Sequence, residues 1–173
     1  SIDAKERIYD PALAGGALLD LSVYPINFAS MILGTEVQKV TSTCVYTASG
    51  VDRQDSITLT YKNGAMAVLC GTMCGVSDRN GGIYGTKGYA VIANINNFES
   101  MTVYDHQHEK IGFYKRPKQI SGYEYEVEAC VKALQQGWKQ CPQMPHTETL
   151  RILEIMDALR REWGITYPLP LEQ

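Results

Sequence analysis

The chain has 173 residues, of which 45% are hydrophobic and 20% charged, so it is long enough to bury a core of ordinary size. Its net charge of -3 removes the electrostatic reason to expect nucleic acid or an anionic membrane as a partner. No apolar run approaches the roughly 20 residues of a membrane span, and no segment is typical of a signal peptide. We therefore expect a cytoplasmic protein without membrane or nucleic-acid partners.

The first element with a clear pattern covers residues 15–34, GGALLDLSVYPINFASMILG, whose apolar residues recur at helical spacing. Pro25 lies inside this pattern, where it removes one backbone hydrogen bond and should kink the helix. Gly34 is placed to end it. The sequence therefore predicts a kinked apolar helix that follows a Gly-Gly pair.

Residues 36–116 are rich in the β-branched and aromatic side chains that suit strands. Asn63-Gly64 predicts a hairpin turn. Further strands are expected at 83–84, 89–95, 101–105 and 110–114. Because no helical pattern interrupts this region, the sheet should be mainly antiparallel.

Two helices are expected after the strands, at 123–139 and at about 147–163, the second ended by Gly164. The first of them places Tyr123, Val127 and Cys130 on one apolar stripe. The order of elements predicts an α+β fold: an open, mainly antiparallel β-sheet with helices packed on one face, in a single domain over residues 1–173. An apolar open face would need a cover, which a second subunit usually supplies.

The five cysteines form no regular framework, and Cys44, Cys70 and Cys130 lie in apolar surroundings. Buried, reduced thiols account for this better than disulfides do. The alternation of Cys70 and Cys74 along a strand likewise indicates core packing.

Two further motifs are more ordinary than they first look. The glycine-rich stretch 81–88 is followed by a strand pattern, whereas a dinucleotide loop must open a helix, so we interpret it as a bend between strands. His106 and His108 lack a third ligand at a metal-binding spacing, so VYDHQHEK is expected to be a polar hairpin turn.

Asp20 and Tyr24 are the polar residues that remain in the first apolar helix, four positions apart and so on one side of it. A tyrosine transfers protons when a nearby cation lowers its pKa from about 10, and a carboxylate one turn away can orient a substrate hydroxyl. The alternative is structural: an Asp favoured by the helix dipole and an amphipathic core Tyr. The spacing leaves both interpretations open.

Four segments in order resemble the C-terminal domain of the Gfo/Idh/MocA family of NAD(P)-dependent oxidoreductases, in its dihydrodiol and glucose-fructose dehydrogenase-like branch. They are ERIYDPALAGGALLDLSVYPIN, IYGTKGYAVIANINNF, GYEYEVEACVKAL and MPHTETLRILEIMDALRREWGITYP, which together extend over nearly the whole chain. The resemblance implies the second half of a two-domain enzyme. The family's Rossmann domain, with its Gly-rich loop and Glu-Lys-Pro motif, is not in this sequence.

The resemblance also implies roles for particular residues. Asp20 and Tyr24 match the family's Asp and its proton-transferring His or Tyr, while Ser22 stands where the family often has Gly. Substrate-pocket positions implied more loosely are Arg7, Arg79, Asn80 and His146. NAD or NADP would be held mainly by the missing domain, with no metal.

The implied substrate is a small molecule, namely a polyol, a sugar or another cyclic secondary alcohol, and the open sheet face would form a homo-oligomer. The chain alone would fold but be inactive. Two other classes stay open: a free-standing ligand-binding or assembly module, and a non-catalytic regulator that kept the fold.

Overall fold

The computed structural model describes residues 7–168. The chain divides into two compact units, Ser1–Gly75 with Thr147–Gln173 as the first and Val76–His146 as the second. Each unit has its own antiparallel sheet, β1-β2-β3 in the first and β4-β5-β6-β7 in the second. The α+β class with antiparallel strands and helices on a sheet face is confirmed, but the strands form two sheets where one was expected.

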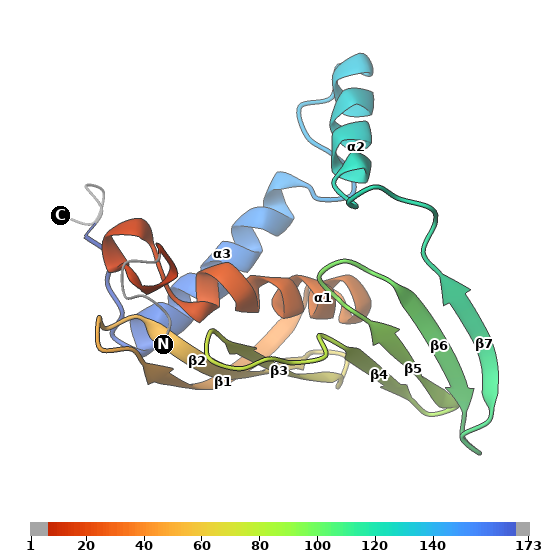
Figure 1. Ribbon diagram of the computed structural model, residues 1–173, viewed down its shortest axis with the longest axis horizontal. Helices are drawn as coiled ribbons and strands as arrows, with labels where there is room; N and C mark the ends of the chain where they lie inside the picture. Colours follow the sequence, from red (N-terminus) through yellow and green to blue (C-terminus); the bar gives the residue numbers. More distant parts are fainter. Residues whose placement is uncertain (1–6, 169–173) are drawn as a thin grey trace. The chain divides into compact units, whose positions relative to one another are not determined.

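The first unit places two helices over one face of its sheet (Figure 1). The strands are β1 (Val37–Tyr46), β2 (Asp52–Tyr61) and β3 (Met66–Thr72), and the helices are α1 (Val23–Leu33) and α3 (His146–Glu162). Alternate residues of β2 point inward, so that Ile57, Leu59 and Tyr61 are buried. They pack in one cluster with Ile26 of α1 and Met156 of α3.

The predicted kink in the first helix takes the form of a π-helical turn, Leu18–Ser22, directly before α1. In a regular α-helix the ring of Pro25 would clash with the carbonyl of Leu21. A widened turn relieves that clash and replaces the sharp bend that the sequence suggested. Gly34 ends α1 as predicted, with a φ of 93° and its N–H bonded to the carbonyl of Ser30.

The Asn63-Gly64 turn joins β2 to β3, as predicted, with Gly64 at a φ of 85°. The pairing of β1 with β2 is irregular at the end of β1 and the start of β2, where Val45 faces Gln54 but Tyr46 faces Asp52. This irregularity changes the alternation of β2, so that Asp52 and Asp55 are both buried although they are three residues apart.

The second unit contains a four-stranded meander, β4 (Gly81–Gly85), β5 (Gly88–Ala93), β6 (Ser100–Asp105) and β7 (Lys110–Lys115). The glycine-rich stretch is the β4–β5 hairpin, which confirms the prediction of a bend between strands. The segment with His106 and His108 is the turn between β6 and β7, also as predicted.

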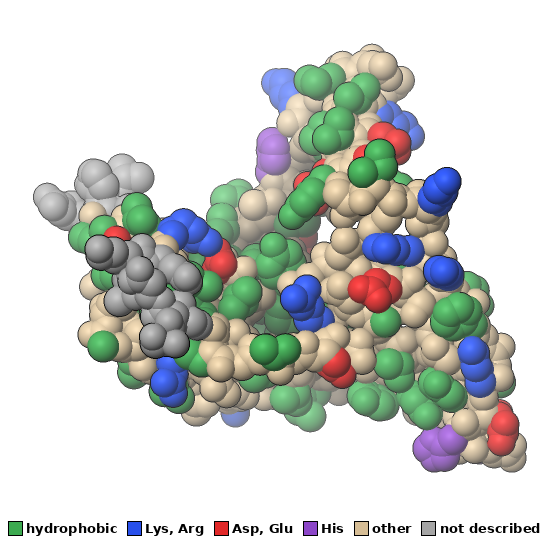
Figure 2. Space-filling view, viewed as in Figure 1, with side chains coloured by type: hydrophobic (Ala, Val, Ile, Leu, Met, Phe, Trp, Pro, Cys, Tyr) green, Lys and Arg blue, Asp and Glu red, His purple; other side chains and the backbone are tan. Residues whose placement is uncertain are grey.

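Helix α2 (Glu124–Gln135) differs from the expectation of a buried stripe. Tyr123, just before the helix, and Val127 and Leu134 within it are exposed, and several hydrophobic side chains lie on this part of the surface in Figure 2. Within the described residues of α2, only Ala133 is buried. A helical pattern predicts that one face is apolar, but not that an element of the same chain covers it.

The prediction of buried thiols was wrong for three of the cysteines. Cys70, Cys74 and Cys130 are exposed, whereas Cys44 and Cys141 are half-buried. In β3 the inward positions include Ala67 and Leu69, so Cys70 is on the outer face, and Cys74 lies beyond the end of the strand.

The segment Pro11–Leu33 is long and apolar enough, by length and composition, to cross a membrane, although the sequence pattern suggested no such run. The core helix of a soluble protein passes the same test. Here Leu18, Ile26 and Ala29 of this segment pack in the core of the first unit, and we therefore interpret it as a core element.

Candidate active site

Asp20 lies in the middle of the π-helical turn, and its carboxylate forms an ion pair with Arg7. Arg7 begins the short 3₁₀ turn Arg7–Tyr9 that precedes the Gly-Gly pair. The side chains of Arg7 and Asp20 are 56% and 31% exposed, so both remain within reach of a ligand. The structure thus brings together two of the six predicted site residues and gives Asp20 a cation as its partner.

Tyr24 is the second residue of α1, four positions after Asp20. Its side chain is 45% exposed, whereas a tyrosine of the core such as Tyr61 is 1% exposed. The core-packing alternative for Tyr24 is therefore wrong. A phenol that faces solvent can meet a substrate hydroxyl.

Two buried aspartates of β2 hold the turn that carries Asp20. Asp52, which is 0% exposed, accepts a hydrogen bond from the backbone N–H of Leu18 at 2.6 Å. Asp55, which is 2% exposed, accepts one from the hydroxyl of Ser22 at 2.6 Å. Leu18 and Ser22 are the first and last residues of the π-helical turn. The turn is therefore fixed at both ends from the same strand.

Glycines make this close approach possible. A Cβ on Gly16 would overlap the Oδ1 atom of Asp52, and Gly16 has a φ of 122°. A Cβ on Gly71 of β3 would overlap the hydroxyl of Ser22 and lie 3.0 Å from the Oδ2 atom of Asp55. Ser22 thus occupies space that Gly71 leaves free.

Asp52 and Asp55, with their hydrogen bonds to the π-helical turn, are called the anchor below. Burial is the main cause of the raised pKa values of these two carboxyl groups. It raises the pKa of Asp52 to about 6, against the opposing effect of the hydrogen bond from Leu18. Burial also raises the pKa of Asp55, which the hydrogen bond from Ser22 partly offsets. Among the described residues, the Oδ1 atoms of both aspartates have no hydrogen-bond partner. Burial thus favours the neutral form of both carboxyl groups.

The sequence interpretation missed Asp52 and Asp55 entirely. The available signal was a pair of acidic residues, DRQD, at the start of a strand whose other inward positions are apolar. Strict alternation would have placed Asp52 and Asp55 on opposite faces. Only the irregular pairing of β1 with β2 brings them to one face.

The other three predicted pocket residues belong to the second unit and are exposed. Arg79 has a φ of 56° in the loop before β4. Asn80 donates to Asp78 of its own loop at 2.9 Å and accepts from the backbone N–H of Asn94, which follows β5, at 3.3 Å. His146 begins α3, and its backbone N–H is bonded to the side chain of Gln140. Their substrate role stays a prediction.

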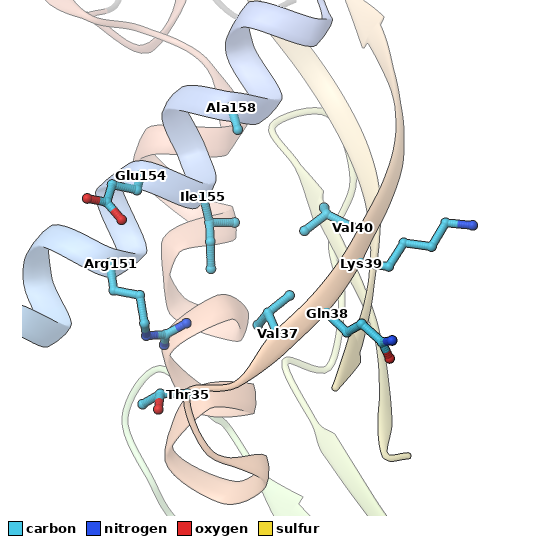
Figure 3. Close-up of a pocket in the computed structure, with 9 residues that line it drawn as sticks. All are labelled: Thr35, Val37, Gln38, Lys39, Val40, Arg151, Glu154, Ile155 and Ala158. Carbon is cyan, nitrogen blue, oxygen red and sulfur yellow. The ribbon is translucent and has the colours of Figure 1, made fainter. Parts of the chain in front are cut away.

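A separate pocket of about 310 Å³ lies between α3 and β1 in the first unit (Figure 3). It is lined by Thr35, Val37, Gln38, Lys39, Val40, Arg151, Glu154, Ile155 and Ala158. The side chains of Gln38 and Lys39 point away from it. Arg151 is bound to Glu148 at 2.6 Å and also bonds Ser30 of α1. Because the Arg151 guanidinium is already used in the contact of α1 with α3, we assign this pocket no function.

The residues present do not fit a dinucleotide. A pyrophosphate site needs a Gly-rich loop that leads from a strand into a helix N-terminus. In the part of the chain that the structure describes, the glycine-rich segment is a hairpin between β4 and β5. The glycine-rich stretch of this chain is therefore not a pyrophosphate site.

Known proteins resemble this chain in sequence. Residues 2–91 match the GFO/IDH/MocA C-terminal domain. The trans-1,2-dihydrobenzene-1,2-diol dehydrogenase of Xenopus tropicalis is 30% identical over 168 residues, which cover 94% of this chain and 51% of that protein. The Homo sapiens enzyme of the same name is 26% identical, with 94% and 50% covered. The chain spans about half the length of the curated relatives it matches.

Solved structures share the fold. The aldose-aldose oxidoreductase of Caulobacter crescentus, complexed with glycerol, has a TM-score of 0.79 and 20% identity, covering 92% of this chain and 49% of that one. The 3-ketoreductase KijD10 of Actinomadura kijaniata, complexed with NADP and TDP-benzene, has a TM-score of 0.73 and 21% identity, covering 90% and 48%.

Proposed function

The chain belongs to the GFO/IDH/MocA family, and on this premise we propose that it is the C-terminal substrate-binding and oligomerisation domain of a cytoplasmic NAD(P)-dependent oxidoreductase. The substrate would be a polyol, a sugar or another cyclic secondary alcohol. The observation that carries the proposal is the anchored turn. Its rigid attachment to β2 supports Asp20 and Tyr24, the two residues that match the family's proton-transfer motif.

The proposed chemistry assigns a separate task to each group. Tyr24 moves the proton to or from the hydroxyl oxygen of the substrate, while Asp20 accepts a hydrogen bond from a substrate hydroxyl. Arg7 holds the Asp20 carboxylate in place through their ion pair. The nicotinamide supplies the hydride acceptor or donor when bound, and residues outside this chain would hold it. The fixed turn favours catalysis because proton transfer depends on alignment.

The proposed oligomer uses an aromatic face of the second unit's sheet. Strand pairing places Tyr84 opposite Tyr89 and Tyr89 opposite Tyr104, and their rings stack at 6.1 Å and 4.8 Å. Phe113 pairs with Thr102 on the same face. Tyr84 is 81% exposed and Phe113 is 53% exposed, which is more aromatic surface than a monomer usually leaves open.

The oligomer is tested by the molar mass of the full-length protein in solution, measured by light scattering. Phe113→Asp should lower the mass to that of the monomer, because a carboxylate on a buried aromatic face is costly. Gln107→Asp, on the exposed β6–β7 turn, should leave it unchanged. A wild-type protein that is already monomeric would contradict the proposal.

The catalytic role is tested by kinetics of the full-length protein. Its reduction of NAD⁺ or NADP⁺ is followed with glycerol, an aldose and a trans-cyclic diol. Tyr24→Phe should lower kcat by roughly 10²–10⁴-fold, the usual contribution of general acid–base catalysis. Tyr125→Phe, which removes a hydroxyl from an exposed tyrosine of α2, is the matched control and should leave kcat unchanged.

Two outcomes separate the parts of this proposal. If the wild-type protein reduces neither nucleotide with any alcohol, the oxidoreductase assignment is wrong and a binding module becomes the better description. If the enzyme is active and Tyr24→Phe has full kcat, the family activity stands but Tyr24 does not transfer the proton.

A further inference from the structure

Two thiols of the second unit lie next to each other. Cys130 and Cys141 have a distance of 4.0 Å between their sulfur atoms, with the Cys141 thiol donating to the Cys130 sulfur. Both are free. They belong to separate elements: Cys130 lies in α2, and Cys141 lies in the loop that leads to α3. Contact between two thiols across a loop is the starting arrangement for an intramolecular disulfide.

The backbone around Cys141 holds this arrangement. Cys141 forms an isolated β-bridge with Met144, whose N–H is bonded to the Cys141 carbonyl at 3.1 Å. Cys130 is fixed by the hydrogen bonding of α2. A disulfide joins sulfur atoms about 2 Å apart, so the two thiols have to close a gap of about 2 Å. Rotation of the two side chains can supply a movement of this size.

We propose that Cys130 and Cys141 form an oxidative modification site at which low-molecular-weight disulfides such as oxidised glutathione produce an intramolecular disulfide. The Cys130 thiolate attacks one sulfur of oxidised glutathione, forming a mixed disulfide and releasing one glutathione thiolate. The Cys141 thiolate then attacks the Cys130 sulfur and displaces the second. Two protons leave the protein thiols, and their two electrons reduce one glutathione disulfide to two glutathione molecules.

Exposure distinguishes the roles of the two sulfurs. Cys130 is exposed and meets the incoming disulfide, whereas Cys141 is half-buried and suits the resolving step. Burial raises the pKa of the Cys141 thiol, and its hydrogen bond to Cys130 raises it further. Cys141 therefore reacts mainly after the mixed disulfide is next to it.

The disulfide would tether a helix that has few buried side chains of its own. Among the described residues of α2 only Ala133 is buried. The bond would connect the middle of α2 to the loop that ends at His146, the first residue of α3. Oxidation would thus stiffen this segment without altering Asp20 or Tyr24, and reduction by glutathione would release it.

The test is a tryptic peptide map of the full-length protein equilibrated with oxidised glutathione and alkylated before digestion. Trypsin cuts after Lys132 and Lys139, so the disulfide joins two otherwise separate peptides, residues 119–132 and 140–151. We expect this linked pair to be the main product of both cysteines. In urea its yield should fall at least about tenfold, because unfolding removes the high effective concentration of one thiol near the other.

Matched variants complete the test. Cys74→Ser changes another exposed thiol and should leave the linked pair intact. Cys141→Ser should abolish it and leave Cys130 as a stable mixed disulfide with glutathione. Recovery of both peptides unlinked from the folded wild-type protein, or linkage of Cys130 to a different cysteine, would overturn the proposal.

Discussion

The two units of the chain differ in how completely each buries its own apolar residues. In the first unit, core residues come from the π-helical turn, α1, β2, β3 and α3 and form one cluster. In the described part of the second unit, Ile92 and Ala133 are the buried hydrophobic residues. Large apolar side chains such as Tyr84 and Leu134 stay exposed there.

This difference separates a unit that buries its own apolar residues from one that leaves many of them exposed. The first unit covers its helices with its own sheet and fixes the turn of Asp20 with buried hydrogen bonds. The second unit has ordered strands with open faces, as expected of a surface that meets another subunit or another part of a longer protein. Substitutions should therefore affect stability strongly in the first unit and weakly in the second.

The largest effect is expected from Gly71→Ala. The added Cβ would overlap the buried hydroxyl of Ser22 and approach Asp55, so we expect the free energy of unfolding to fall by about 2–4 kcal/mol. Gly85→Ala in the second unit is the matched control, since its nearest neighbour there is the Gly88 carbonyl at 3.5 Å. Urea unfolding of both variants measures the difference.

A double variant sharpens this result. Ser22→Gly removes the overlapping hydroxyl, so adding it to Gly71→Ala should recover part of the lost stability. Equal losses in Gly71→Ala and Gly85→Ala, or no coupling between residues 22 and 71, would contradict the proposed anchor.

A smaller effect is expected from Asp52→Asn, and it depends on pH. Because burial raises the pKa of Asp52 to about 6, the folded state binds the proton more tightly than the unfolded chain does. Its contribution to stability is thus present below pH 4 and is lost as the pH rises to about 6. Each pKa unit corresponds to about 1.4 kcal/mol, so the loss is on the order of 2–3 kcal/mol.

The asparagine cannot ionise and lacks this dependence. The free energy of unfolding of the wild type, minus that of Asp52→Asn, should therefore fall by the same amount between pH 4 and pH 7. Parallel pH curves for the two proteins would show that Asp52 keeps an ordinary pKa in the fold.

The smallest effect on stability is expected from Arg7→Ala. Its ion pair with Asp20 is exposed, and such pairs contribute about 0.2–1 kcal/mol, less at high salt. Thermal unfolding at low and high ionic strength measures it. A loss above about 2 kcal/mol that persists at high salt would mean that Arg7 acts by packing rather than by charge.

Much of the fold followed from local patterns. The pattern of alternating residues predicted strands, Asn63-Gly64 predicted the β2–β3 hairpin, and Gly164 predicted the end of α3. Each of these features depends on residues close together in the sequence. Polarity and helical spacing singled out Asp20 and Tyr24, and the resemblance implied their roles. The exposure of Tyr24 then removed the core alternative. The division into two sheets depends on strand partners far apart in sequence, so no local pattern could predict it.

The anchor could not be predicted for a related reason. Asp52 and Asp55 act together only because the pairing of β1 with β2 shifts between Val45 and Tyr46. The exposed stripe of α2 was missed since periodicity identifies an apolar face but not its cover. Both the register of β1 against β2 and the exposure of α2 depend on how elements pack together, which the pattern within one element does not show.

The most direct test of the anchored turn is hydrogen exchange on the isolated 173-residue chain, read by peptide mass spectrometry. We predict that amides of residues 18–22 and of β2 exchange among the slowest in the protein, because buried carboxylates and strand pairing hold them. Amides of α2 should exchange among the fastest of the helical segments. Exchange of residues 18–22 as rapid as that of α2 would contradict the claim that the first unit holds the candidate site by itself.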